Sequence, residues 1–168
     1  MERTDAAADE AFLLDLLNST PIVDGVPRDL LDRAWLRAHG HSGSSAEWQA
    51  GRAARSTLQA VVRGQQSARS LGPLLDGVSY RPVASAQGVE WRLETPPGRT
   101  AAVRAALAWN RLRHTRPDRL RPCGNPECAL FLIDHSKPNR ARWCSMAGCG
   151  NRMKARRHYE RTRTDPDR

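Results

Sequence analysis

Four cysteines, all in the last third of a 168-residue chain, constrain its fold more than any other feature. They form two pairs, Cys123 with Cys128 and Cys144 with Cys149, in the spacing C-x4-C-x15-C-x4-C. Four thiolates suit a closed tetrahedral Zn2+ site, because soft sulfur ligands hold this ion and leave no position for a reacting water. We therefore expect one structural zinc ion, bound by all four cysteines.

The same cysteines could instead form disulfides, in any of three pairings. Disulfides persist in oxidising compartments, whereas cysteine clusters in a reducing cytoplasm are more often metal ligands. The first ten residues carry Glu2, Asp5, Asp9 and Glu10 rather than a basic segment followed by an apolar run, which argues against a secretory signal. No stretch approaches the length of a membrane span. We expect a cytoplasmic protein with no membrane partner, and we favour zinc.

Positive charge is concentrated in the cysteine-containing region. Residues 119–168 carry 12 Lys or Arg against 5 Asp or Glu, whereas residues 1–118 carry 15 against 13. Clustered positive charge attracts polyanions, and neutralised phosphates release condensed counterions, so nucleic acid is the obvious partner. A solvated, solubilising surface is the alternative explanation of the charge.

The segments around the cysteines predict a small, metal-folded module. The apolar run 129–133 and the alternating segment 140–144 predict two strands of a hairpin, with turn-forming residues 134–139 between them. A helix is expected over 150–163, which lacks proline and has a weak apolar face. The first cysteine pair forms one knuckle (123–128) and the second pair another (144–149). These two knuckles, the hairpin between them and the helix together predict a treble-clef-like zinc finger. Zinc would supply the folding free energy that so small a core lacks, on the order of 10 kcal/mol.

The predicted finger helix is basic around most of its circumference. It could lie in the major groove with arginines on guanine edges, or contact phosphates alone. Trp143 and Tyr159 could stack on bases, but we expect both to pack in the small core. His135 stays outside the metal shell, because four thiolates complete the tetrahedron. The candidate nucleic-acid contacts are Arg140, Arg142, Arg152, Lys154, Arg156, Arg157, Arg161 and Arg163.

The chain as a whole is expected to be an α+β protein. A mainly helical N-terminal domain at 10–116 precedes the finger at 119–163, and 164–168 form a disordered tail. Apolar periodicity predicts helices that end near Asn18, that run from Pro27 to Gly40, and that start at the capping motif Ser44-x-x-Glu47. Segments 78–83 and 89–93 predict a hairpin in which Pro82 marks an edge strand. A last helix, with an apolar side from Ala102 to Leu112, leads to the finger.

Several motifs resemble the CGNR zinc finger. They are Cys123-Gly124-Asn125-Pro126-Glu127-Cys128, Arg142-Trp143-Cys144-Ser145-Met146 and Cys149-Gly150-Asn151-Arg152, together with Phe131, Asp134 and Lys154. Residues 12–20, Asp29-Leu30-Leu31 and Trp35-Leu36 resemble the start of the ABATE domain, which commonly precedes that finger. The resemblance implies a bacterial zinc finger that binds DNA, in a family of stress-induced transcription regulators. Asp15 and Asn18 could face a ligand pocket. We prefer the alternative, in which Asp15 is solvated and Asn18 caps or turns the end of the helix.

Three classes of function follow from these features. The first is a DNA-binding transcription regulator, associated with the nucleoid, whose N-terminal domain serves sensing, dimerisation or docking. The second uses the same finger for RNA or for an acidic protein; its few aromatic residues favour duplex DNA. The third, an enzyme, is disfavoured by the closed thiolate site and by the lack of a phosphate loop or a nucleophile signature. Useful specificity would favour a homodimer, although no heptad marks an interface.

Overall fold

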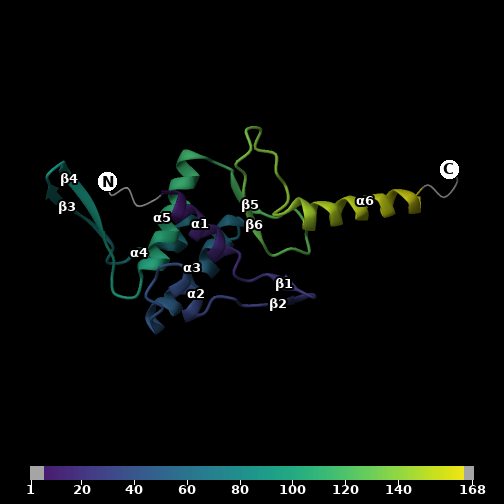
Figure 1. Ribbon diagram of the computed structural model, residues 1–168. Helices are drawn as coiled ribbons and strands as arrows, with labels where there is room; N and C mark the ends of the chain where they lie inside the picture. The colour runs from purple at the N-terminus through teal and green to yellow at the C-terminus, as the bar shows by residue number, and fades with distance from the viewer. Residues whose placement is uncertain (1–5, 165–168) are drawn as a thin grey trace.

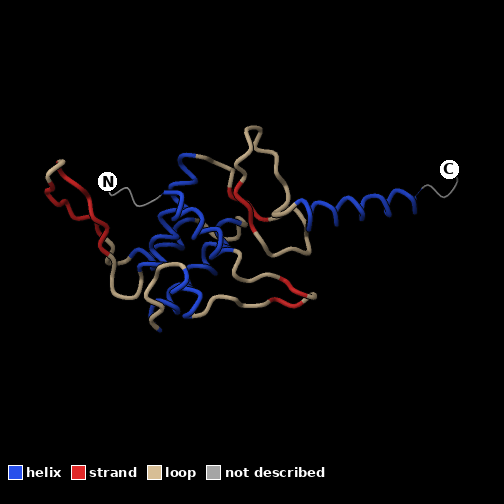
Figure 2. Tube along the Cα trace, in the orientation of Figure 1, coloured by secondary structure: helices blue, strands red, loops and turns tan. Residues whose placement is uncertain are grey.

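The computed structural model describes residues 6–164, and helices dominate it. About half of these residues are helical, and the strands among them form three two-stranded antiparallel hairpins (Figures 1 and 2). The predicted α+β class is therefore confirmed. Residues 165–168 of the predicted tail lie outside the described residues. The elements are α1 (Ala6–Leu17), β1 (Ile22–Val23), β2 (Val26–Pro27), α2 (Arg33–Ala38), α3 (Ser45–Val62), η1 (Ala68–Leu71), α4 (Gly72–Leu75), β3 (Ser79–Ser85), β4 (Gly88–Glu94), α5 (Thr100–Thr115), β5 (Leu120–Pro122), β6 (Phe131–Ile133), η2 (Met146–Gly150) and α6 (Asn151–Thr164).

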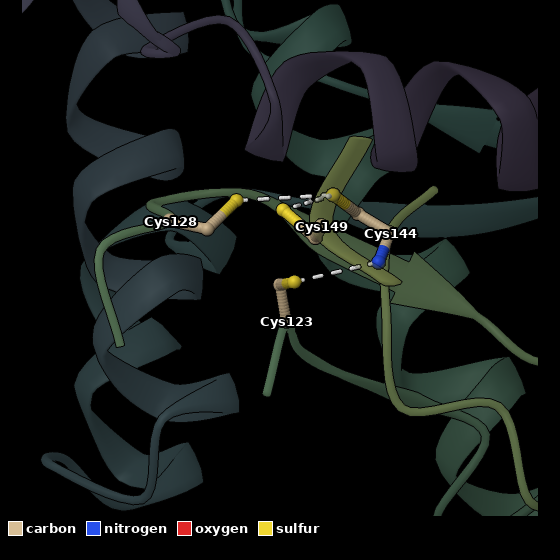
Figure 3. A group of neighbouring side chains, drawn as sticks. All are labelled: Cys123, Cys128, Cys144 and Cys149. Carbon is tan, nitrogen blue, oxygen red and sulfur yellow. Dashed lines mark hydrogen bonds between the residues drawn. The ribbon is translucent and has the colours of Figure 1, made fainter. Parts of the chain in front are cut away.

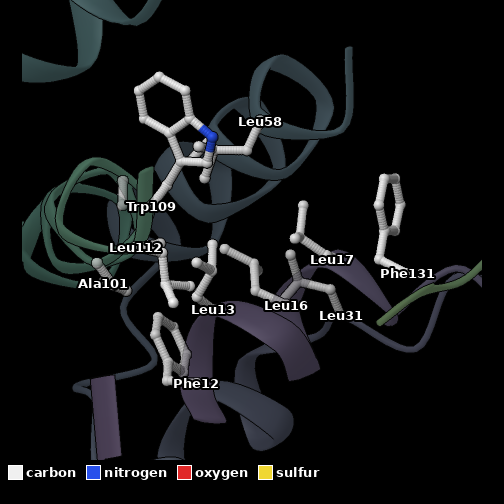
Figure 4. Close-up of a cluster of buried hydrophobic side chains, with 14 of the residues drawn as sticks. Phe12, Leu13, Leu16, Leu17, Leu31, Leu58, Ala101, Trp109, Leu112 and Phe131 are labelled. Atoms are coloured by element: carbon white, nitrogen blue, oxygen red, sulfur yellow. The ribbon is translucent and has the colours of Figure 1, made fainter. Parts of the chain in front are cut away.

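Helices α1, α3 and α5 pack around one apolar core (Figure 4). Leu13, Leu16 and Leu17 of α1 and Leu58 of α3 are fully buried. Helix α5 contributes mainly alanines to the core, and their small side chains let its backbone approach its neighbours closely. No helix in the described part of the chain is long and apolar enough to cross a membrane.

The start of α3 confirms the predicted capping motif and shows an additional role for its glutamate. Ser44 Oγ accepts the Glu47 N–H at 3.1 Å, as an N-cap should. Glu47 is buried, and its carboxylate accepts from Ser42, from the Gly43 N–H and from the Ala101 N–H. The same side chain therefore joins the start of α3 to the first turn of α5.

The second helix is shorter than predicted, because a hairpin occupies the residues before it. We expected this helix to start at Pro27, but Pro27 ends β2, which pairs with β1. Asp24 and Gly25 have φ values of 51° and 78°, the left-handed conformation of a tight Asp-Gly hairpin turn. Helix α2 begins after Asp32, whose side chain accepts the Trp35 N–H at 2.7 Å.

The predicted hairpin in the middle of the chain is confirmed. Strands β3 and β4 pair over seven residues each, from the pair Ser79 with Glu94 to the pair Ser85 with Gly88. Pro82 lies within β3, as expected of an edge strand. The hairpin projects from the helices at one end of the molecule (Figure 1).

The finger contains a hairpin, but its strands are not the predicted pair. Strand β6 pairs with β5, which precedes the first cysteine, and residues 140–144 form no strand. Side chains take the hydrogen bonds that a strand there would have used. Asp134 Oδ2 accepts the Ala141 N–H at 2.7 Å, and Arg121 Nη2 donates to the Ala141 carbonyl at 2.7 Å. Hydrogen bonds from Ser136 and Ala141, together with the Arg121 guanidinium, lower the pKa of Asp134 to about 2.

Strand β6 also anchors the finger to the helical core. Phe131 and Ile133 belong to the same apolar cluster as the leucines of α1. The Asn18 amide, just after α1, accepts the Phe131 N–H at 2.7 Å and donates to the Phe131 carbonyl at 3.2 Å. Arg63 donates to the Ala129 carbonyl at 3.0 Å, and its guanidinium lies over the Phe131 ring. Asn18 therefore connects two parts of the fold, and the division of the chain near residues 116–118 stays a prediction.

Candidate metal centre and basic helix

The four cysteines meet at one point, although they come from separate parts of the finger. Cys123 follows β5, Cys128 and Cys144 lie in loops, and Cys149 lies in the π-helical turn η2. Their sulfurs all lie within 4.8 Å of one another, and Figure 3 shows the side chains pointing toward a common centre. The Cys128–Cys144 and Cys144–Cys149 sulfur distances are 3.8 and 3.7 Å. A tetrahedral ion with metal–sulfur bonds of about 2.3 Å holds its ligands about 3.8 Å apart, so the cluster fits one structural zinc.

Hydrogen-bond donors orient two of the sulfurs. The Cys144 N–H donates to Cys123 Sγ at 3.4 Å, and the Asn125 side-chain amide donates to Cys149 Sγ at 3.4 Å. Asn125 is only 1% exposed, and its Oδ1 accepts the Glu127 N–H at 3.1 Å. Such outer contacts fix ligand orientation and spread the thiolate charge. Asn125 was not predicted as a site residue, because its partner Cys149 is distant in the chain; its place between the first two cysteines was the available signal.

The sulfurs differ in how easily they ionise. Burial raises the pKa values of the Cys128 and Cys144 thiols, and the neighbouring Cys149 sulfur raises both further. Burial also opposes ionisation of Cys149, but the Asn125 amide and the three other cysteines outweigh it and lower that pKa. Zinc binds thiolates, so its binding displaces protons from such a cluster. Four sulfurs complete the coordination, and the site can hold the fold together but offers no position for substrate.

Two glycines beside the cysteines make room for an indole ring. A Cβ at Gly124 would lie 3.0 Å from the Arg142 carbonyl and 3.2 Å from the Trp143 ring. A Cβ at Gly150 would lie 2.8 Å from Met146 Sδ and 3.3 Å from the same ring. Trp143 is half-buried between the two knuckles, which is the packing role predicted for it.

The basic helix α6 leaves the second knuckle and extends away from the rest of the molecule (Figure 1). Among the side chains described on it, Met153 is half-buried and all the others are exposed. Tyr159 is 69% exposed, so the prediction that it packs in the core is wrong. A helix with so few apolar residues has no face to bury, and Tyr159 is left in solvent.

The structure brings most of the predicted nucleic-acid contacts to this helix. Those on α6 with described, exposed side chains are Arg152, Lys154, Arg156, Arg157 and Arg161; Arg163 lies on α6, but its side chain is outside the described residues. Arg156 forms ion pairs with Glu127 at 3.3 Å and with Glu160 at 3.2 Å. Arg140 and Arg142 are exposed in the loop before Cys144 rather than on a strand. Whether any of the eight contacts nucleic acid stays a prediction.

The remaining candidates lie elsewhere. His135 sits beside Glu10 and Arg116, away from the sulfurs. Asp15 is more than half exposed, 3.4 Å from His39. Asn18 is engaged by β6, as described above.

Comparison with known proteins identifies the C-terminal segment. Residues 119–162 match the family model of the CGNR zinc finger, and this range contains all four cysteines and the β5–β6 hairpin. The predicted CGNR resemblance is confirmed for this segment. No curated protein matches the chain.

Proposed function

We propose that this protein binds duplex DNA through α6 and acts as a transcription regulator. The observation that carries the proposal is the exposure of α6, whose described side chains face solvent on nearly every side. Fourteen helical residues span about 21 Å, and the major groove admits a helix of ordinary diameter. Zinc is required because η2, which carries Cys149, leads directly into this helix.

The charges on α6 support a polyanionic partner. Lys154, Arg157 and Arg161 follow one another at spacings of three and four, so they share one side of the helix. Arg152 and Arg156 lie on another side. The side with Arg152 and Arg156 can therefore face base edges while the side with Lys154, Arg157 and Arg161 approaches a phosphate backbone.

A second candidate partner is single-stranded RNA. Its support is Tyr159, which stands exposed among the basic residues of α6 and has a ring on which a splayed base could stack. The basic surface would serve an acidic protein as well. We favour duplex DNA, because Tyr159 is the only Phe, Tyr or Trp on the described part of α6, whereas basic residues occupy two of its sides.

We further propose that the helical part of the chain is an ABATE-like domain that serves sensing, dimerisation or docking, and that the protein acts by binding rather than by catalysis. The support is the residue pattern of α1 and α2 and the closed coordination of the only metal-binding cluster among residues 6–164. In this proposal the protein works in the cytoplasm, at the nucleoid when it is bound to DNA.

The test is selection from a random duplex DNA pool by the zinc-loaded protein at physiological salt, followed by sequencing. Enrichment of one motif is expected. The double variant Lys154→Ala, Arg157→Ala should then bind that motif with a salt slope reduced by about two units, one per lost phosphate contact. The matched control removes two exposed arginines that lie outside α6, Arg69→Ala and Arg81→Ala, and should keep the slope.

No enrichment of a duplex motif, with retention of a single-stranded RNA pool that a Tyr159→Ala variant loses, would favour the RNA function. An unchanged salt slope in the α6 variant would place the nucleic-acid contact elsewhere.

A further inference from the structure

The β3–β4 hairpin presents one wholly apolar face to solvent. The register of its strands places every second cross-strand pair on that face. Tyr80 is 51% exposed, Val89 64% and Trp91 47%. An isolated two-stranded hairpin is marginally stable in water and gains stability from further strands. The apolar pairs are Tyr80 with Leu93, Pro82 with Trp91, and Ala84 with Val89.

The two edges of this hairpin differ in their ability to pair with another strand. Pro82 has no N–H, so within a ladder it occupies a pair that exchanges no hydrogen bonds, and its partner is Trp91. Residues of such pairs direct their backbone groups outward. The free edge of β4 therefore offers the N–H and C=O of Val89, Trp91 and Leu93, whereas the free edge of β3 is interrupted at Pro82.

The open edge of β4 is complementary to itself. If two copies of β4 run antiparallel about a two-fold axis at Trp91, Glu90 faces the partner's Arg92 and Arg92 faces the partner's Glu90. On the other side of the sheet, Val89 faces the partner's Leu93. Arg81 already pairs with Glu94, but Glu90 and Arg92 have no ion-pair partner among the residues that the structure describes. Opposite charges and apolar side chains directly across a ladder both stabilise a sheet.

We propose that this edge of β4 is a homodimer interface, through which two hairpins form a four-stranded antiparallel sheet. The interface is isologous, with Trp91 at the axis, so it closes after two copies. Pro82 on the outer strands limits further addition at the two ends of the sheet. The proposal does not depend on DNA binding and is tested without nucleic acid.

Charge reversal tests both the partner and the register. Analytical ultracentrifugation of the zinc-loaded protein should show a dimer of the 18.7 kDa chain. Glu90→Arg brings two arginines face to face across the interface, and Arg92→Glu brings two glutamates face to face. Each single variant should therefore lose about half of its sedimenting mass. A 1:1 mixture of the two should regain the dimer, because every facing pair is again opposite in charge, and the double variant should do so alone.

The control is Arg81→Glu, the same reversal on the same face of the hairpin but on the blocked strand, which should remain dimeric. All three positions lie on the solvent-exposed hairpin, so zinc content and helical circular dichroism should be unchanged in every variant. A wild-type monomer up to the solubility limit would overturn the proposal. So would single variants that remain dimeric, or a mixture of the two that stays monomeric.

Discussion

Asn18 is the residue whose replacement most directly tests how the metal-binding region is attached to the helices. Its amide accepts the Phe131 N–H at 2.7 Å and donates to the Phe131 carbonyl at 3.2 Å, and Phe131 is only 1% exposed. Asn18→Ala removes both bonds and leaves two backbone groups without partners. Each buried, unpaired polar group costs about 1–3 kcal/mol. Because water can partly replace the amide, we expect the free energy of unfolding to fall by about 2–4 kcal/mol, a large part of the stability of an ordinary domain.

The assay is urea unfolding of the zinc-loaded protein, followed in parallel by helical circular dichroism and by zinc release to a colorimetric chelator. Both transitions should move together to lower urea. Phe131 and Ile133 of β6 belong to the apolar core, and β6 pairs with β5 in the hairpin of the metal-binding region. Asn110→Ala is the control, since Asn110 is exposed on α5 and should change stability by less than about 0.5 kcal/mol. A loss of less than about 1 kcal/mol for Asn18→Ala, or movement of zinc release alone, would refute the reasoning.

Three further predictions concern the metal, the pH dependence and the finger. Cys149→Ser should abolish stoichiometric zinc, measured by elemental analysis, because it breaks a closed four-sulfur site; full zinc content would contradict the assignment. Arg55 pairs with Asp29 and lowers its pKa, so the pair stabilises the fold above the ordinary pKa of 3.8 and loses this effect as pH falls below that value. The wild type should therefore lose more stability than Asp29→Asn between pH 5 and about pH 3 in urea titrations, and parallel curves would refute this. Gly124→Ala should reduce zinc affinity in chelator competition, because its Cβ would meet Trp143 at 3.2 Å; unchanged affinity would show that the ring moves without cost.

Local signals in the sequence predicted the elements that depend on local physics. Ser44 and Glu47 predicted the start of α3, and the alternating residues on either side of Ala86 and Gln87 predicted β3 and β4. The cysteine spacing predicted the metal cluster, because two knuckles of equal length can present four sulfurs to one ion. These features were accessible because each is signalled by a pattern of closely spaced residues, namely a helix cap, an alternating segment or a C-x4-C pair.

The features that were missed depend on side chains that replace backbone partners. Residues 140–144 alternate as a strand does, but Asp134 and Arg121 take the backbone groups of Ala141 and leave no ladder. The partner of Asn18 lies 113 residues away, so no local pattern revealed that contact. The Asp-Gly turn between β1 and β2 was a local signal, but its flanking strands are only two residues long and their alternation is too short to recognise.

The arrangement around Cys149 ties the direction of α6 to the metal. Helix α6 has almost no apolar surface, so apolar packing against the core of α1, α3 and α5 does not hold it in place. It continues from η2, whose Cys149 is fixed by the other three sulfurs and by the Asn125 amide. Asn125 lies in the first knuckle, and that knuckle is joined through β6 to the core of α1, α3 and α5. A continuous set of contacts therefore runs from the helical core through the metal to the first turn of α6. We expect zinc to set where the basic helix points as well as whether the finger folds, so loss of the metal should remove the geometry that the proposed groove binding requires even where the charges of α6 remain.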